Sequence, residues 1–91
     1  MAQASSEAVI ATLPTDVDLH ARPAADFVRA AMAFSADVRV AAGDREVDAK
    51  SLLSVLALGA KGGTELRLTA AGDDALVALD KLSACVATLS D

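Results

Sequence analysis

The sequence predicts an α+β domain of two layers, in which helices cover one face of a four-stranded sheet. Two observations lead to this expectation. Apolar residues alternate in some segments and recur at helical spacing in others, and these segments follow one another in the order β-α-β-β-α-β-α. Leu, Val, Ile and Phe make up 24 of the 91 residues, which is enough apolar material for one small core.

The first strand and the first helix are predicted in the first third of the chain. Residues 1–7 are small and polar, and we expect a flexible tail there and a single domain over residues 8–91. Residues 8–13 (AVIATL) are rich in β-forming side chains and predict a strand. The spacing then predicts a helix over residues 21–34, with Pro23 in its first turn. The apolar stripe of this helix consists of Ala24, Phe27, Val28, Ala31 and Phe34.

The rest of the chain predicts a hairpin, a short helix, a strand and a last helix. Residues 37–41 and 45–48 flank Gly43-Asp44 and predict the hairpin. Residues 51–58 (SLLSVLAL) predict the short helix, with Ser51 as its N-cap or first residue and Gly59 as its C-cap. Alternation over residues 64–69 predicts the fourth strand. Residues 72–74 open the last helix, whose expected stripe is Leu76, Leu79, Leu82, Val86 and Leu89.

The composition argues against several classes of function. The net charge is −5, and the chain has two Phe, no Trp and no Tyr, so we expect no nucleic-acid binding. One Cys and one His argue against a disulfide framework and a structural metal site, and Cys85 is expected to be a packing residue. The start of the chain has no basic segment and no apolar run approaches 18 residues. We therefore expect a cytoplasmic protein that does not insert into membranes.

The histidine, His20, is predicted at the joint between a loop and the first helix. Backbone N–H groups at the start of a helix have no partner within the helix, and the helix dipole places partial positive charge there. Arg22 adds a guanidinium that can bind two phosphate oxygens at once. This combination of an imidazole with anion-binding groups suits a histidine that accepts and returns phosphate. The alternative is a histidine that caps the helix or faces water.

Two motifs point to a known family: residues 19–25 (LHARPAA), and residues 49–53 (AKSLL) followed by Leu58 and Gly59. Together they resemble the HPr family, the histidine-containing phosphocarriers of the bacterial sugar phosphotransferase system. Residues 19–25 (LHARPAA) are similar to the active-site signature of that family. Residues 49–53 (AKSLL), followed by Leu58 and Gly59, are similar to its regulatory-serine segment. The resemblance runs from residue 8 to the end of the chain. It implies an open-faced β-sandwich with a four-stranded antiparallel sheet and three helices on one face.

The resemblance also implies what the active-site motif does. His20 would accept a phosphoryl group on Nδ1 from the phosphohistidine of enzyme I and pass it to a histidine of a sugar-specific enzyme IIA. Arg22 would stabilise the phosphate. Such a protein is a transfer intermediate rather than an enzyme with its own turnover. We expect it to need no cofactor and to be a monomer.

Ser51 has two interpretations. As a helix N-cap it needs only its hydroxyl oxygen. The resemblance implies instead phosphorylation by the HPr kinase/phosphorylase, which would produce a regulatory form. Lys50 precedes Ser51, and a helix N-terminus tolerates a phosphate.

A partner-binding surface is expected beside His20. The short helix is apolar nearly all round, and a helix this short cannot bury every side. We expect Leu52, Leu53 and Leu56 to supply an exposed apolar patch and Arg29 to supply a charged rim.

This chain departs from the family pattern at three positions. Asp18 stands where the family commonly has Gly, and its carboxylate could moderate transfer or pair with Arg22. Met32 and Ser54 stand where Lys is frequent, which bears on the affinity for a generic enzyme I.

Two other functions remain open at this point. A mainly regulatory HPr homologue, in a carbon catabolite, nitrogen or dihydroxyacetone branch, would act through phospho-Ser51 and a transcriptional regulator. Retention of His20 and Arg22 favours the carrier. An acyl carrier protein is also small and acidic, but it needs Asp-Ser-Leu where this chain has Lys50-Ser51-Leu52, and its all-helical fold conflicts with the alternating segments.

Overall fold

The computed structural model describes residues 6–90, and its elements follow the predicted order β-α-β-β-α-β-α. The strands are β1 (Ser6–Thr12), β2 (Asp37–Ala42), β3 (Arg45–Asp48) and β4 (Glu65–Ala71). The helices are α1 (Ala21–Ala31), α2 (Leu52–Leu58) and α3 (Ala75–Ala87).

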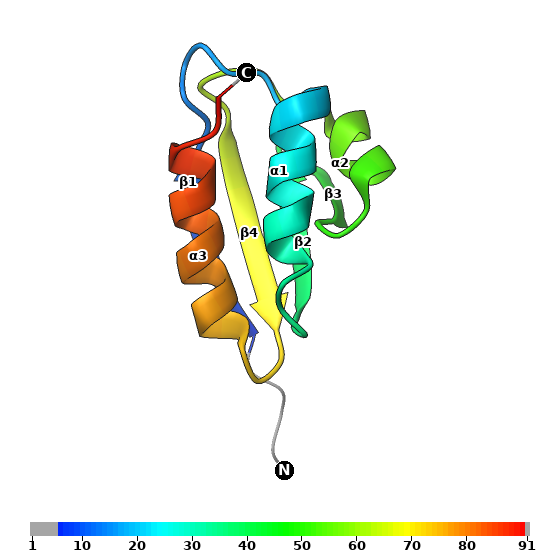
Figure 1. Ribbon diagram of the computed structural model, residues 1–91, viewed down its shortest axis with the longest axis vertical. Helices are drawn as coiled ribbons and strands as arrows, with labels where there is room; N and C mark the ends of the chain where they lie inside the picture. The colour runs from blue at the N-terminus through cyan, green and yellow to red at the C-terminus, as the bar shows by residue number, and fades with distance from the viewer. Residues whose placement is uncertain (1–5, 91) are drawn as a thin grey trace.

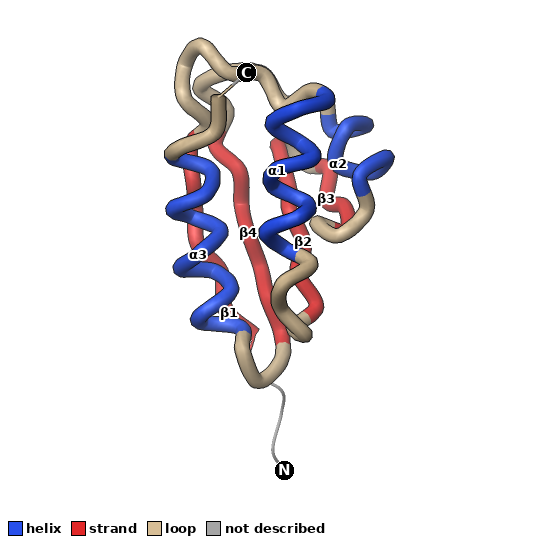
Figure 2. Tube along the Cα trace, in the orientation of Figure 1, coloured by secondary structure: helices blue, strands red, loops and turns tan. Residues whose placement is uncertain are grey.

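The four strands form one sheet in the order β1-β4-β2-β3, and each neighbouring pair is antiparallel. The pattern of the sequence did not determine this order, which places the last strand of the chain between the first two. All three helices lie on one side of the sheet, with α1 and α3 side by side and α2 beside the start of α1 (Figures 1 and 2). The prediction of a four-stranded antiparallel sheet covered by three helices is therefore confirmed.

The core lies between the sheet and the helices, as the alternation of apolar side chains requires. Val38 and Val40 of β2 and Leu66 and Leu68 of β4 are fully buried. Their neighbours in sequence on the opposite face, such as Glu65 and Arg67, are exposed. From the first helix, Phe27 is the largest fully buried side chain. This burial is the main source of stability for the fold.

Three boundaries and one helix face differ from the expectations. Strand β1 begins at Ser6, so Ser6 and Glu7 belong to the sheet rather than to the predicted tail, and Met1–Ser5 lie outside the described residues. Helix α1 ends at Ala31, and Phe34 follows it as a half-buried loop residue. Strand β4 spans Glu65–Ala71 rather than residues 64–69.

The stripe predicted for the last helix was wrong at its first position. Leu76 is 65% exposed, and Ala75 and Ala78 are buried instead. Small side chains allow α3 to approach the sheet and α1 closely, so Ala takes the inner positions at this end of the helix. The remaining predicted positions, Leu79, Leu82, Val86 and Leu89, are buried as expected.

Asp74 connects α3 to the segment that follows α1. Its carboxylate accepts hydrogen bonds from the backbone N–H of Ser35 (2.9 Å) and of Ala36 (2.8 Å) and from the Ser35 hydroxyl (3.3 Å). The backbone hydrogen bond from Ser35, helped by those from Ala36 and the hydroxyl, holds the pKa of Asp74 below its ordinary value. Asp74 thus binds the backbone of another segment and does not cap α3 with its side chain.

Among residues 6–90, no helix has both the length and the apolar character needed to cross a membrane.

Candidate phosphoryl-transfer site

His20 is the N-cap residue of α1, and its side chain is exposed. Its backbone carbonyl accepts the first hydrogen bond of the helix, from Ala24 N–H at 2.8 Å. The imidazole itself makes no capping hydrogen bond. The half of the alternative in which the side chain caps the helix is therefore not supported. The exposure of the side chain fits both a histidine that reacts and one that only faces water.

The first turn of α1 is suited to an anion. The turn itself contains no acidic residue that would offset the partial positive charge of the helix start. The carboxylate of Asp18, which precedes the helix, lines the pocket beside His20. Arg22 lies in this turn with an exposed side chain. Pro23 is buried there, at a position where its missing N–H leaves no helix hydrogen bond unmade. The start of α1 thus has an exposed histidine, helix-start N–H groups and an exposed arginine in its first turn.

The loop before His20 is held against the segment that follows α2. Leu19 is buried, and its N–H donates to the carbonyl of Ala60 at 2.8 Å. Asp18 accepts a hydrogen bond from Gly62 N–H on Oδ1 at 2.8 Å, and its Oδ2 lies 4.0 Å from Lys61 Nζ. Asp18 therefore pairs with Lys61, and not with Arg22 as one of the sequence hypotheses suggested.

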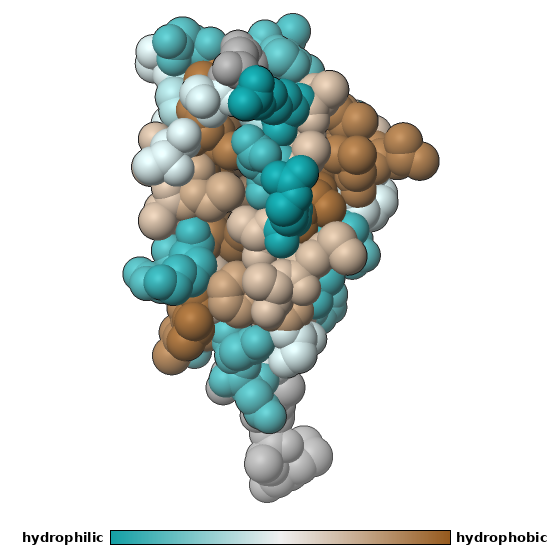
Figure 3. All heavy atoms as spheres, in the orientation of Figure 1, coloured by the Kyte–Doolittle hydropathy of each residue, from teal (hydrophilic) through white to brown (hydrophobic). Residues whose placement is uncertain are grey.

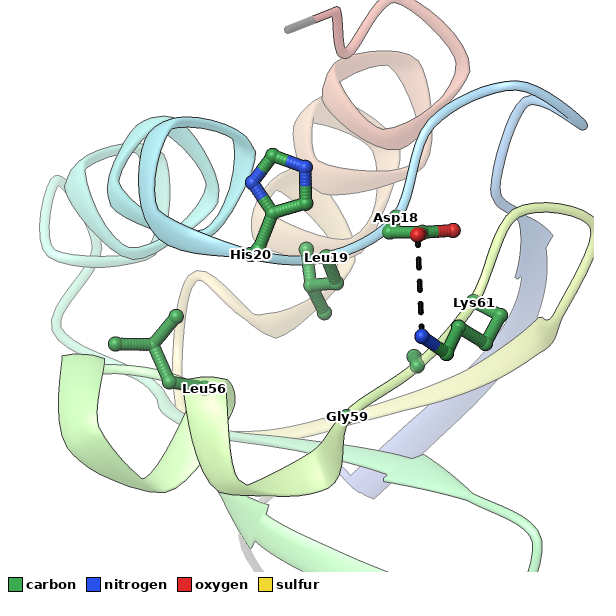
Figure 4. Close-up of a pocket in the computed structure, with 7 residues that line it drawn as sticks. Asp18, Leu19, His20, Leu56, Gly59 and Lys61 are labelled. Carbon is green, nitrogen blue, oxygen red and sulfur yellow. Dashed lines mark ion pairs between the residues drawn. The ribbon is translucent and has the colours of Figure 1, made fainter.

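These loops enclose a shallow pocket of about 140 Å³ beside the imidazole. The ring of His20 stands on one side of it, Leu56 approaches from α2, and the Asp18–Lys61 pair closes the other end (Figure 4). The pocket therefore joins the start of α1 to the face of α2, as expected for a histidine presented beside an apolar patch.

Ser51 is the N-cap of α2, as one of its two interpretations predicted. Its Oγ accepts a hydrogen bond from Ser54 N–H at 3.3 Å, and Gly59 ends the helix in the left-handed conformation that glycine favours. Lys50 does not turn toward Ser51, because its ammonium donates to the carbonyl of Phe34 at 2.6 Å. The expected help of Lys50 to a phosphate at Ser51 is thus not supported.

Helix α2 divides into a buried and an exposed side. Val55 and Leu58 are buried, whereas Leu53 is 81% exposed and Leu52 is 40% exposed. Leu56 is half-buried. Apolar atoms gather at this corner of the surface, over α2, at the upper right of Figure 3. A contiguous patch of exposed, large apolar side chains often marks an interaction site.

Arg29 and Cys85, which the sequence also singled out, lie on helices α1 and α3. Arg29 lies in the last turn of α1 and forms an exposed ion pair with Asp26 at 2.9 Å. Cys85 of α3 is half-buried, and burial together with the charge of Asp26 raises the pKa of its thiol. A raised pKa leaves less of the reactive thiolate, which agrees with a packing role for Cys85.

The sequence profile of the family described as "PTS HPr component phosphorylation site" matches residues 9–88. The chain belongs to the HPr family of the phosphotransferase system. It is 43% identical over 84 residues to the phosphocarrier protein HPr of Haloferax volcanii, and the match covers 90% of this chain and 93% of that one. The structure of an HPr from Bacillus anthracis superposes with a TM-score of 0.85 at 33% identity and covers 90% of this chain and 98% of that one.

Two further relatives show the range of proteins that contain this unit. The HPr-like protein Crh of Bacillus subtilis is 44% identical over 68 residues, which cover 75% of this chain and 80% of Crh. The multiphosphoryl transfer protein of Xanthomonas campestris is 43% identical over 72 residues, which cover 79% of this chain. The chain spans only 9% of the length of that relative.

Sequence reasoning missed the part that Lys61 and Gly62 play in the site. Both contact Asp18, which is more than 40 positions earlier in the chain, and local spacing contains no signal for such a contact. The Gly62-Gly63 pair indicated only a tight turn.

Proposed function

We propose that this chain is a phosphocarrier in which His20 accepts a phosphoryl group from phosphorylated enzyme I and passes it to an enzyme IIA. The observation that carries the proposal is the exposed imidazole of His20 at the N-cap position of α1, with no side-chain capping hydrogen bond and with an exposed Arg22 two positions later. Membership of the HPr family supports the same assignment.

The chemistry requires one bond to form and one to break in each step. A ring nitrogen of His20 attacks the phosphorus, the bond between phosphorus and the donor's imidazole nitrogen breaks, and the donor imidazole leaves with that electron pair. The three equatorial oxygens carry the charge during transfer, so fixed positive groups lower the barrier most. The helix-start N–H groups and Arg22 are the groups of this chain that can supply that stabilisation.

The partner-facing surface in this proposal comprises Leu52, Leu53, Leu56 and Arg29. Leu52 and Leu53 are exposed on α2, and Leu56 lines the pocket that His20 also lines. Arg29 lies further along α1 and would meet acidic groups of a partner. Both partners would use this corner in turn, in the cytoplasm, because each must reach the same imidazole.

Regulation at Ser51 by an HPr kinase/phosphorylase is a second part of the proposal. Ser51 lies on the α2 helix that carries the proposed docking leucines, so a phosphate there would place negative charge within the partner surface. Lys50 would not neutralise it while its ammonium is bound to Phe34.

The similarity to Crh favours one alternative, a mainly regulatory homologue that binds a transcriptional regulator when Ser51 is phosphorylated. The two functions differ in where phosphate is found. The carrier holds it on His20 as an acid-labile group, and the regulatory homologue holds it on Ser51 as an acid-stable one.

Incubation with phosphoenolpyruvate and enzyme I of the same organism, followed by intact-mass measurement, tests the proposal. We expect a gain of about 80 Da that is lost in acid. His20→Ala should show no gain, and because the side chain is exposed its free energy of unfolding should stay within ~1 kcal/mol of wild type. Acid-labile phosphate on the His20→Ala variant, or none on the wild type, would contradict the carrier function.

A further inference from the structure

The loop that carries His20 is fastened to the segment after α2 by contacts of Leu19 and of Asp18. Leu19 itself is 2% exposed and donates its N–H to the carbonyl of Ala60 at 2.8 Å. On its other side, His20 N–H donates to the carbonyl of Asp18 at 2.9 Å. The position of the His20 backbone therefore follows directly from the position of Asp18.

Asp18 adds a side-chain hydrogen bond between this loop and the segment after α2. Its Oδ1 accepts the N–H of Gly62 at 2.8 Å. A hydrogen bond to a charged carboxylate is short and strong. The companion ion pair with Lys61 is weaker, because its atoms are 4.0 Å apart and the Lys61 side chain is 81% exposed. Of the two contacts of the Asp18 side chain, the hydrogen bond from Gly62 is thus the stronger, and it adds to the backbone hydrogen bond from Leu19 to Ala60.

The packing around Gly62 explains why this contact is specific. A Cβ atom at position 62 would lie 2.2 Å from the backbone oxygen of Thr15, so only glycine allows the two loops to approach this closely. Once the loops are in contact, the Gly62 N–H needs an acceptor, because an unmade backbone hydrogen bond in such a place costs free energy. Asp18 supplies that acceptor.

We infer that Asp18 is a positioning residue for phosphoryl transfer, whose hydrogen bond to Gly62 N–H holds the loop so that His20 is presented in one orientation at the rim of its pocket. The inference rests on the proposed carrier function of His20. Asp18 acts here through the backbone of residues 18–20, and what the role requires is an acceptor oxygen at the place of Oδ1, whose charge strengthens the hydrogen bond. A reacting group displaced by a fraction of an ångström transfers more slowly, which makes the role measurable.

Two substitutions separate position from charge. Asp18→Asn keeps an oxygen at the place of Oδ1 and removes the charge, whereas Asp18→Glu keeps the charge and moves the carboxylate by one methylene. Single-turnover transfer from phosphorylated enzyme I should stay within about twofold of wild type for Asp18→Asn and fall about tenfold for Asp18→Glu. The KM for enzyme I should be unchanged in both, since Leu52 and Leu53 are untouched.

A second measurement reads the contact itself. Hydrogen exchange of the Gly62 amide, followed by NMR, should be slow in the wild type and in Asp18→Asn and faster in Asp18→Glu. If Asp18→Glu does not fold, Asp18→Ala removes the acceptor and takes its place. Asp16→Asn is the matched control: it removes an exposed carboxylate from the same loop, keeps the hydrogen bond from Gly62 to Asp18, and should transfer at the wild-type rate.

Several results would overturn the inference. They are a wild-type rate for Asp18→Glu, a rate for Asp18→Asn as low as for Asp18→Glu, or a Gly62 amide that exchanges alike in all forms. If the wild type takes no phosphate from enzyme I, the carrier function fails, and the hydrogen-exchange comparison by itself shows whether Asp18 holds the loop.

Discussion

Arg22 and His20 have different tasks in the proposed transfer, although they lie two positions apart. Arg22 is exposed in a helix turn without acidic residues, so its guanidinium can approach the phosphoryl oxygens as charge develops on them. We expect Arg22→Ala to lower the single-turnover rate of transfer from enzyme I by about 10²-fold, the loss typical of removing one such group. Rapid-quench kinetics measure the transfer rate, and calorimetry measures the affinity for enzyme I.

Arg22→Lys is the informative companion to Arg22→Ala. Lysine keeps the charge and loses the planar pair of donors, so part of the rate should return. A loss confined to binding, with single-turnover transfer unchanged, would show that Arg22 contacts the partner and not the phosphoryl group.

Helix α2 combines a structural face and an exposed face, and a matched pair of substitutions tests them separately. Leu53→Ala removes an 81% exposed side chain, so Tm should stay unchanged while the KM for enzyme I rises several-fold. Val55→Ala removes fully buried methyl groups of the same helix and should lower the free energy of unfolding by about 2 kcal/mol. Thermal unfolding and steady-state transfer kinetics measure both. An unchanged KM for Leu53→Ala would place the docking surface elsewhere.

The N-cap of α2 provides a second test at the scale of one element. Aspartate caps a helix as well as serine does, so Ser51→Asp should keep Tm or raise it slightly, with Ser54 N–H still bound. The new charge lies on the helix of the proposed docking surface, without neutralisation by Lys50, and should repel the acidic groups of a partner. We expect transfer from enzyme I to slow about tenfold, equivalent to ~1.4 kcal/mol.

Salt and stability distinguish the possible outcomes for Ser51→Asp. The slowing should lessen as salt rises, because screening weakens the repulsion. A wild-type rate at low salt would place Ser51 outside the contact with enzyme I. Unfolding of the variant would show that the hydroxyl has a structural role that a carboxylate cannot replace.

At the scale of the whole molecule, Asp74 links the start of α3 to the segment between α1 and β2. The hydrogen bonds from Ser35 and Ala36 lower the pKa of this carboxyl in the folded state. The ionised carboxylate therefore stabilises the folded state more than the protonated carboxyl does. Its contribution to stability is therefore present above the unfolded-state pKa, about 4, and is lost as pH falls through the lower folded-state pKa.

Asp74→Ala should accordingly lower Tm at neutral pH, and the difference from wild type should shrink as the pH falls below about 4. Thermal unfolding monitored by circular dichroism from pH 7 to pH 2.5 or so measures this. Asp73→Ala is the control, because Asp73 is the exposed neighbour in the same turn. A Tm difference for Asp74→Ala that does not change with pH would show that the effect comes from packing and not from the charged carboxylate.

Local pattern was sufficient for most of the fold and for the centre of the site. The alternation around Val38 and Val40 and around Leu66 and Leu68 identified the inner face of the sheet, because a strand turns successive side chains to opposite faces. The capping chemistry of Ser51 and Gly59 identified both ends of α2. His20 was located at the start of α1 by the same kind of local signal.

Tertiary contacts decided the rest. Helix α1 ends at Ala31, before Phe34. The segment that follows the helix is bound instead by Asp74, which accepts a hydrogen bond from the N–H of Ser35 although it lies 39 positions later in the chain. Leu76 faces solvent because the inner positions of α3 are shared by small Ala side chains that permit close packing, and hydrophobicity alone does not reveal that preference. Asp18 meets Lys61 and Gly62 only because the sheet brings two distant loops together. A sequence reports short-range periodicity and capping directly, whereas contacts between distant segments depend on which strands become neighbours, and here the position of β4 between β1 and β2 settled that.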